Sequence, residues 1–365
     1  MRQLPTVEDV ARAAGVSRQT VSNVLNSPAV VKPETMSRVK TAIEQLGYRP
    51  HASARRLRTR KSSTIGVRLD PMSNGISGSL LDRFLHAITE QAAERGLRIL
   101  LFTARSPEHE IEEFRRLRDG SDIDAFVLTS TFRHDPRTAW LLENDVPFVT
   151  FGRPSGDDDL GEPLHPWVDV DGFSGSSQAT NHAVDGGATR VGYLGFDDGT
   201  TTALERRAGW ASASAERLGL AGDDLDGLAR ATKDGVPQGI TAATSLLASA
   251  NPPDAIVCAS DSLALGAMMA AAGLGRSALP VIGYDNTPVA AAVGLSSVDQ
   301  PLSLVAQSAL ELIFGENGST VVPHVHSAAD PIHRLLTPTL VVRRSTELAP
   351  VEDPGFPLAG NRNER

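Results

Sequence analysis

The chain has 365 residues, of which 41% are hydrophobic and 22% charged, and its formal net charge is −9. This length predicts more than one folded core in a globular protein. No run approaches the ~20 apolar residues of a membrane-spanning helix, and the N-terminus lacks the apolar segment of a secretory signal. The single cysteine, Cys258, excludes an intrachain disulfide and a cysteine-rich zinc site. Together these features predict a cytosolic protein.

The charge is distributed unevenly. Residues 1–62 carry 12 Lys and Arg against 4 Asp and Glu, a local balance of +8, and the remainder carries −17. A small basic segment beside a large acidic one suggests that a polyanion binds the N-terminal segment alone. A basic segment that is merely solvated would have the same charge, so the residue pattern within the segment must distinguish polyanion binding from simple solvation.

The first fifty residues predict three helices. The first begins after Thr6, a capping residue with Asp9 three positions later, and ends at Gly15. The second begins after Ser17, and a third begins near Pro33. The tight turn between the first two helices is the spacing of a helix-turn-helix. The side chains expected to face inward are Val7, Val10, Ala11 and Ala14, then Val21, Val24 and Leu25, then Met36, Val39, Ile43 and Leu46.

The outward side of the second helix carries Arg18, Gln19, Ser22 and Asn23. Arg suits O6 and N7 of guanine, and Gln or Asn suits N6 and N7 of adenine, in the major groove of DNA. Any surface helix is polar, so the polar face of this helix alone would not indicate DNA binding. The three-helix unit, its turn and its basic charge together favour DNA binding.

These residues resemble the DNA-binding head of the LacI/GalR family of bacterial regulators. The matching segments are TVEDVA (6–11), AGVS (14–17), TVSNVLN (20–26), AIEQLGYRP (42–50) and ARRLR (54–58). The resemblance implies that Arg18, Gln19 and Asn23 read bases, although many members have Arg in place of Asn23, which leaves the operator sequence open. It further implies that the DNA backbone is contacted by Thr6, Ser17, Asn26, Thr35 and Tyr48.

Residues 50–63 follow the head and are strongly basic. They could form about two helical turns, too few to be stable alone in water. The family resemblance implies a hinge helix that docks in the minor groove through Ala54, Arg55 and Leu57. Leu57 would be the apolar wedge between central base pairs, at a cost of about a few kcal/mol of unstacking. The alternative is a basic interdomain linker with an incidental leucine.

From residue 64 onward, strand and helix patterns alternate, which predicts parallel sheets covered by helices. A Pro-, Gly- and Asp-rich stretch at 154–166 suggests a second lobe starting near Trp167. Two α/β lobes leave a cleft at the C-terminal ends of the strands, where ligands usually bind. Strands are expected at 65–69, 98–102, 125–128, 148–151, 191–194, 255–258 and 281–284, and helices at 80–93, 110–117, 172–184, 203–218, 239–250 and 262–272.

The family resemblance extends through this body to about residue 346. Its landmarks are VDVD (168–171), RRAGW (206–210), SDSLALG (260–266), VIGYD (281–285) and LVVRRST (340–346). It implies a two-lobed body like that of periplasmic binding proteins. The organisation expected is a helix-turn-helix head at 1–49, a hinge at 50–63, a first lobe at about 64–163 and 290–325, a second lobe at about 164–289 and 326–346, and a flexible tail at 347–365.

The resemblance also implies that Arg206, Asp261 and Asp285 are polar ligand contacts in the cleft. Two carboxylates and one guanidinium at strand ends suit vicinal hydroxyls. Asn74 and Arg153 follow strands and are further candidates. We therefore expect a sugar or sugar derivative as effector. Its class stays open, because GISG stands at 75–78 where family members often have aromatic residues.

Other functional classes fit less well. The sequence has no G-x-S-x-G, P-loop or H-E-x-x-H motif, so we expect neither an enzyme nor a cofactor, although Asp261 and Asp285 could form an acid/base pair. An extracellular solute-binding protein would share the body but not the basic head. The histidines His324, His326 and His333 are typical of an exposed loop more than of a metal site. Cys258 indicates a buried thiol.

Oligomeric state follows from the mode of DNA reading. One head reads half a site, so a two-fold dimer on a near-palindromic operator is expected. The tail has no leucine heptads, which argues against a helical tetramerisation module. The sequence itself leaves open whether the effector releases or strengthens DNA binding, although release is the commoner pattern in the family.

Overall fold

The computed structural model describes residues 5–48, 62–69, 78–132, 134–154, 165–315 and 333–347. The chain divides into two compact units, Met1–Ser62 and Ser63–Arg365, and each is described by itself. Several predictions lie outside the described residues: the hinge contacts Ala54, Arg55 and Leu57, the ligand candidate Asn74, the GISG segment up to residue 77, and His324 and His326.

The N-terminal unit contains the three predicted helices, α1 (Val7–Ala14), α2 (Arg18–Asn26) and α3 (Pro33–Leu46), with a short 3₁₀ turn between the last two. The capping box predicted at Thr6 is present: the Thr6 N–H donates to Asp9 Oδ2 over 2.9 Å. Gly15 ends α1 with a left-handed φ of 61°, a conformation that glycine adopts without strain. Val10, Val21 and Val39 form a fully buried core. Leu25 and Leu46 were expected in this core and are instead 37% and 38% exposed.

The second unit is built on two six-stranded sheets, one in each lobe. The first sheet has the order β11-β5-β4-β3-β1-β2 and the second β12-β10-β9-β8-β6-β7. Every described pairing is parallel except that of β12 with β10. The strands are β1 (Thr64–Arg68), β2 (Arg98–Phe102), β3 (Ala125–Leu128), β4 (Phe148–Phe151), β5 (Trp167–Val170), β6 (Val191–Phe196), β7 (Ala229–Thr232), β8 (Ala255–Cys258), β9 (Val281–Tyr284), β10 (Ser296–Asp299), β11 (His333–Leu336) and β12 (Thr339–Val341).

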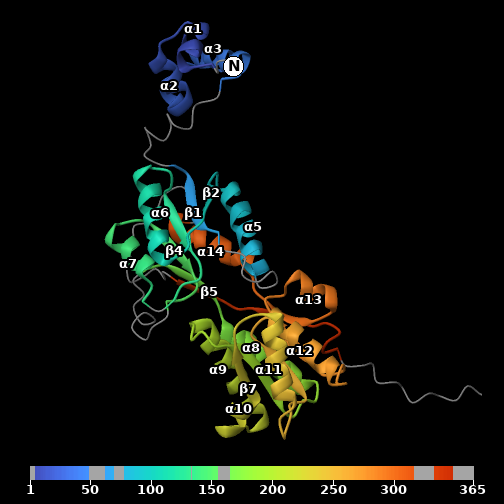
Figure 1. Cartoon of the computed structure of the whole chain (residues 1–365). Helices are drawn as coiled ribbons and strands as arrows, with labels where there is room; N and C mark the ends of the chain where they lie inside the picture. The colour runs from blue at the N-terminus through green and yellow to red at the C-terminus, as the bar shows by residue number, and fades with distance from the viewer. Residues whose placement is uncertain are drawn as a thin grey trace, which may run out of the picture. The chain divides into compact units, whose positions relative to one another are not determined.

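Helices cover both faces of the first sheet (Figure 1). Alternate residues of a strand point to opposite faces. Val127 of β3 accordingly packs with α5 (Gly78–Glu94) and α14 (Leu302–Phe314), whereas its neighbour Phe126 packs with α6 (Pro107–Asp119) and α7 (Pro136–Glu143). The core of the first lobe is therefore split by the sheet.

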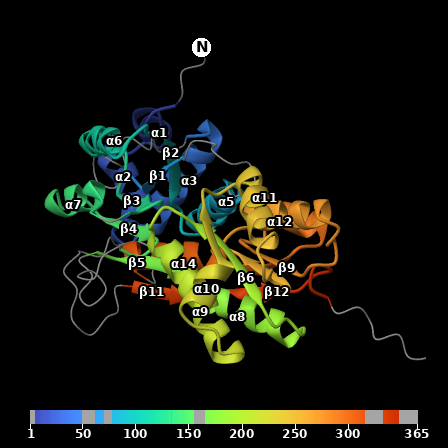
Figure 2. The same cartoon turned by 60° about the horizontal axis from the view of Figure 1, so that its bottom comes forward.

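The second lobe has one continuous apolar core around β6, β8 and β9. Its helices are α8 (Gly172–Asp185), α9 (Thr201–Leu218), α10 (Asp223–Leu228), α11 (Val236–Leu247), α12 (Asp261–Gly273) and α13 (Pro288–Val293). The helices α8 and α9 lie side by side (Figure 2). A Cβ built on Gly209 of α9 would lie 2.1 Å from the carbonyl oxygen of Phe173 in α8, so only glycine permits this approach.

The sheet order corrects the predicted lobe boundaries. Strand β5 pairs with β4, so the first lobe continues past residue 164 as far as Val170. The chain returns to the first lobe after β10, whose last residue is Asp299, later than the position near 290 that we expected. Residues 326–346 do not form one piece of the second lobe, because β11 pairs in the first sheet and β12 in the second.

Within the part of the chain that the structure describes, no helix combines the length and the apolar character needed to cross a membrane.

Candidate functional site

The exposed face of α2 presents the polar side chains predicted to read DNA. Ser17 caps the helix by accepting a hydrogen bond from the N–H of Thr20 over 3.1 Å. Gln19 donates through Nε2 to Asn23 Oδ1 over 3.0 Å, so these two amides lie one turn apart on one face. Arg18 pairs with Glu8 of α1 over 2.8 Å, and both side chains are largely exposed. Donors and acceptors therefore line one accessible side of the helix.

The predicted backbone contacts of the head occupy different environments. Thr6 and Ser17 are exposed cap residues at the starts of α1 and α2, and Thr35 is half-buried in α3. Tyr48 is buried in the core of the unit, and burial raises the pKa of its phenol. The side chain of Asn26 lies outside the described part of the structure.

A pocket of about 330 Å³ lies between the two lobes of the second unit. This volume is in the range of small-molecule sites. Its walls come partly from the carboxyl ends of parallel strands and the loops that follow them, the position at which open α/β sheets bind ligands, and partly from the helices α5 and α9. The lining residues are Leu80, Leu81, Thr129, Ser130, Thr131, Phe151, Gly152, Asp169, Val170, Gly172, Phe196, Asp198, Thr200, Thr202, Glu205, Arg206 and Gln300.

Arg206 lines this pocket from the first half of α9, and not from a strand end as we expected. Its guanidinium lies 3.6 Å from the centroid of the Tyr284 ring, and Nη1 donates to the carbonyl oxygen of Ala259 over 2.5 Å. The carboxylate of Asp285 is 3.6 Å away. Arg206 Nε is buried and has no hydrogen-bond partner. A buried donor without a partner is costly unless a ligand satisfies it.

Asp285 follows β9 and contacts Arg206 from outside the pocket lining. Its φ is 97°, a strained value for a residue with a side chain. The carboxylate accepts a hydrogen bond from Gln300 Nε2 over 2.7 Å, and Gln300 lines the pocket. Burial raises the pKa of Asp285, although Arg206 and Gln300 oppose that shift. Asp285 therefore fixes two pocket side chains, and it does not itself line the pocket.

The strained turn at Asp285 is held from the other lobe. Arg83 of α5 donates through Nη1 to the carbonyl oxygens of Asp285 and Asn286, over 2.8 and 3.1 Å. Its Nη2 pairs with Asp299 over 3.1 Å. Arg83, a side chain of the first lobe, therefore hydrogen-bonds the backbone of the second lobe next to the pocket.

Asp261, the third ligand candidate, is the first residue of α12 and is not among the residues that line the pocket. Oδ2 accepts from the N–H of Thr287 over 2.7 Å, and Oδ1 accepts from Ser297 Oγ over 2.6 Å. Burial, followed by repulsion from Asp285, raises the pKa of Asp261 to about 6. In this structure its carboxylate joins α12 to the loop after β9 and to β10.

Arg153, a further candidate, lies just after β4. Its Nε donates to Asp169 Oδ2 over 3.0 Å, and its Nη2 donates to Glu205 Oε2. Burial, and then the carboxylates of Asp169 and Asp171, raise the pKa of Glu205 to about 7 against the opposing effect of Arg153. Both partners of Arg153 line the pocket.

Four polar residues line the pocket without having been predicted as site residues: Asp169, Asp198, Glu205 and Gln300. Asp169 lies within β5 and Asp198 follows β6, and polar residues near the carboxyl ends of strands are a usable signal. Strand β5 itself was not predicted, so this signal could not be applied to Asp169. Gln300 carried no local signal, because it becomes a pocket residue only where the chain crosses between lobes.

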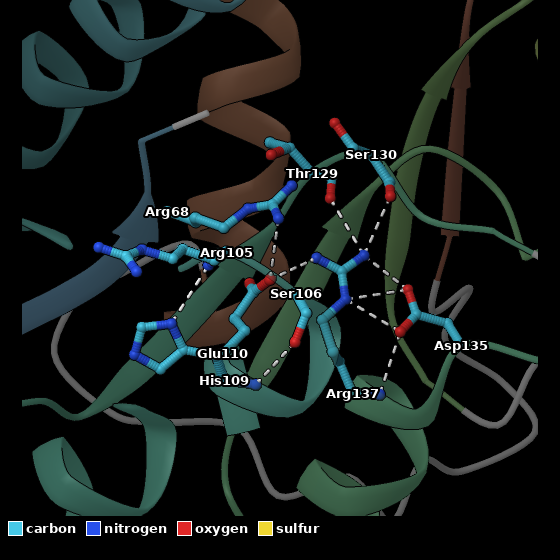
Figure 3. A network of polar contacts seen from close by, with 9 residues as sticks. All are labelled: Arg68, Arg105, Ser106, His109, Glu110, Thr129, Ser130, Asp135 and Arg137. Carbon is cyan, nitrogen blue, oxygen red and sulfur yellow. Dashed lines mark hydrogen bonds and ion pairs between the residues drawn. The ribbon is translucent and has the colours of Figure 1, made fainter. Parts of the chain in front are cut away.

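A buried charge network supports the first-lobe wall of the pocket (Figure 3). Arg137 Nη1 donates to Glu110 Oε2 over 2.8 Å, and its Nε and Nη2 donate to Asp135. Nη2 also donates to the carbonyl oxygens of Thr129 and Ser130, over 3.3 and 3.0 Å, and both of these residues line the pocket. Arg68 pairs with Glu110 over 3.3 Å, so two cations balance two anions.

Comparisons with known proteins agree with this arrangement. The description "Bacterial regulatory proteins, lacI family" matches residues 6–51, and "Periplasmic binding protein-like domain" matches residues 180–346. The chain is 32% identical to the HTH-type transcriptional regulator CelR of Thermobifida fusca, over 94% of this chain and 99% of that protein. The chain belongs to the LacI family. Its relatives are transcriptional regulators and not enzymes.

Other relatives and structures extend the match over nearly the whole chain. The HTH-type transcriptional regulator AglR of Rhizobium meliloti (strain 1021) is 31% identical, over 95% of this chain and 96% of that protein. The solved structure of the transcriptional regulator CelR–cellobiose complex is 29% identical, covers 93% of this chain and 99% of its own, and has a TM-score of 0.65. The lac repressor dimer bound to operator is 22% identical, with coverages of 94% and 99% and a TM-score of 0.74, and shares the fold.

Two minor candidates have structural roles among the described residues. Cys258 is fully buried, and burial raises the pKa of its thiol, which makes it a poor nucleophile. His333 stacks on Trp167 with 4.7 Å between ring centroids. No group of three or more His, Cys, Asp or Glu in the described ranges could hold a metal ion.

Proposed function

We propose that this LacI-family regulator is a repressor that binds a near-palindromic operator as a homodimer and is controlled by a small sugar or sugar derivative between its lobes. The observation that carries the proposal is that one chain combines the family's helix-turn-helix head with an interlobe pocket at the strand ends. A protein that only transported or stored a sugar would have no use for the head.

In the proposed DNA complex, Arg18, Gln19 and Asn23 on α2 read base edges in the major groove. The exposed position of this face supports the assignment. Thr6, Ser17, Asn26, Thr35 and Tyr48 contact the DNA backbone. Ala54, Arg55 and Leu57 act at the minor groove as a hinge helix that orders on DNA.

In the proposed effector complex, the orphaned Nε of Arg206 donates to a ligand hydroxyl. Asp285 holds Arg206 and Gln300 toward the ligand, and Asp261 fixes the loop that carries Asp285. A carboxylate-rich pocket with one guanidinium suits a polyhydroxy compound. The CelR–cellobiose complex supports a sugar as the ligand class.

The experiment that tests this function is selection of bound duplexes from a random DNA pool by the purified protein. A near-palindrome with a flexible central step is the expected result. The selected duplex then serves as probe for release by a panel of sugars. Absence of any enriched motif, with and without sugars, would refute operator recognition.

A further inference from the structure

Arg153 joins two carboxylates that belong to different lobes. It follows β4 in the first lobe, where Nε donates to Asp169 Oδ2 over 3.0 Å and the backbone N–H donates to the same oxygen over 3.3 Å. Nη2 pairs with Glu205, which lies on α9 in the second lobe. The side chain of Arg153 is only 12% exposed. One planar guanidinium therefore contacts both acids through two nitrogens held in a fixed relative geometry, which the single ammonium nitrogen of a lysine does not provide.

The guanidinium itself does not line the pocket. Asp169 and Glu205 are lining residues, whereas Arg153 is not. The guanidinium carbon lies 5.9 Å from the ring centroid of Trp167, a buried side chain of β5. Arg153 therefore contacts the two carboxylates from outside the pocket. Asp169 Oδ1 also accepts from the N–H of Val170 over 2.8 Å, and the acceptor sites that remain on the two carboxylates are left for a ligand.

The charge of the pocket wall follows from this arrangement. Among the described lining residues, three carry carboxylates, Asp169, Asp198 and Glu205, and one, Arg206, carries a guanidinium. Arg153 pairs with Asp169 and Glu205 from outside the lining and balances part of their charge. Asp285 already lies 3.6 Å from Arg206. An ionised carboxylate accepts hydrogen bonds and cannot donate them. The hydroxyl groups of a ligand can donate hydrogen bonds to these carboxylates, whereas the negative charge of a phosphate or carboxylate group would be repelled by them.

We propose that Arg153 is a positioning residue that holds Asp169 and Glu205 as paired acceptors on the pocket wall, and that the pocket thereby selects uncharged polyhydroxy effectors against their phosphorylated and carboxylated counterparts. The proposal rests on the proposed function, because it takes the interlobe pocket as the effector site. It differs from the sequence prediction in that Arg153 acts through two carboxylates and does not touch the ligand.

Protonation of Glu205 gives the proposal a second readout. Glu205 faces Arg153, Asp169 and Asp171, shares the pocket with Asp198, and its pKa is about 7 because burial outweighs Arg153. Loss of Arg153 would raise this pKa further and convert the carboxylate from an acceptor into a donor near neutral pH. Discrimination against anions should therefore increase as pH rises through 7 in the wild type, and only at higher pH in Arg153→Met.

The test measures binding of matched neutral and anionic sugars to the intact protein by calorimetry. The probes are glucose, galactose, xylose, maltose and cellobiose, with glucose 6-phosphate, galacturonate and cellobionate as charged counterparts. We expect at least one neutral sugar to bind at least tenfold more tightly than its anionic counterpart. Arg153→Met should weaken the neutral sugar at least tenfold and reduce that ratio, and Arg153→Lys should restore only part of the loss.

Two further variants keep the test decisive. Glu205→Gln leaves Arg153 paired with Asp169 and should also reduce the ratio, so it covers the case in which Arg153→Met does not fold. Arg217→Met is the matched control, since Arg217 lies on the same helix as Glu205 and pairs with Asp185 near the surface. It should change neither affinity nor ratio.

The outcomes separate this inference from the proposed function. Tighter binding of an anionic sugar, or an unchanged affinity and ratio in both Arg153→Met and Glu205→Gln, would overturn the inference while operator selection could still succeed. Binding by no member of the panel would also overturn it, because an uncharged sugar would then not be the ligand class. Failure of operator selection with normal sugar discrimination would refute the regulator and leave the pocket assignment standing.

Discussion

Replacement of Arg137 by methionine should destabilise the second unit strongly. Arg137 is 1% exposed and its guanidinium hydrogen-bonds Glu110, Asp135 and the carbonyl oxygens of Thr129 and Ser130. Methionine fills a similar volume but donates no hydrogen bond. The substitution leaves Asp135 without its main cation and leaves Glu110 with Arg68 alone.

The expected loss of unfolding free energy is about 3–5 kcal/mol, the usual cost of breaking a buried ion pair from one side. Burial already raises the pKa of Glu110 despite two nearby arginines, which indicates how poorly water stabilises this carboxylate. Loss of Arg137 should therefore lower the unfolding free energy by nearly the full cost of an unpaired buried charge. A surface pair such as Arg217–Asp185 contributes about 0–1 kcal/mol, so Arg217→Met is the control.

Urea unfolding followed by tryptophan fluorescence measures this loss, since Trp140 lies on α7 close to the network. Arg137→Met should lower the midpoint without changing the slope. Adding Glu110→Gln and Asp135→Asn should restore part of the stability, because the buried charges then disappear together. A loss below about 1 kcal/mol for Arg137→Met would refute the view that this network is desolvated and mutually dependent.

Four other predictions follow from the head, the hinge and the pocket. Gln19→Ala should relax base preference at one half-site position by about 1–3 kcal/mol in a competition assay; a uniform loss across sequences would indicate a backbone contact instead. Leu57→Ala should lose specific operator affinity while retaining salt-sensitive nonspecific binding, and unchanged specificity would argue against a wedge. Arg206→Ala should bind operator normally but ignore the effector in a release assay; a normal response would remove Arg206 from the site. Because the pKa of Glu205 is raised from 4.5 to about 7 on folding, the folded state binds more protons in that window and unfolding free energy should fall as pH rises through it. Glu205→Gln should flatten that slope, and an unaltered slope would contradict the shift.

The head could be predicted from sequence because its signals are local. The capping box at Thr6, the left-handed Gly15 and the spacing of apolar residues act within a few positions of each other. The two errors, Leu25 and Leu46, concern the last turns of their helices, where the direction of a side chain depends on what packs beyond the helix end. The position of Tyr48 in the core depends likewise on packing between helices.

The seven predicted strands of the body are present, and the five that were not predicted are short, with three or four residues each. Strand β10 (Ser296–Asp299) and strand β7 (Ala229–Thr232) contain few apolar side chains, so their local pattern is that of a loop. They are strands because neighbouring strands supply hydrogen-bond partners. Strands β5 and β11 likewise belong to the first sheet because they pair with each other, although they are distant in the sequence, and because β5 also pairs with β4.

The sequence by itself determined the family, the helix-turn-helix head and the alternating α/β character of the body, because these are encoded in local spacing and long ordered motifs. It also indicated Arg206 and Asp285 near one site. Only the tertiary structure decided that Asp285 and Asp261 act from behind the pocket, and that Gln300 and Glu205 stand on its wall. The physical reason is that a pocket between lobes is assembled from segments as far apart in the chain as Leu80 and Gln300, and the direction of each side chain is set by partners that no local pattern encodes.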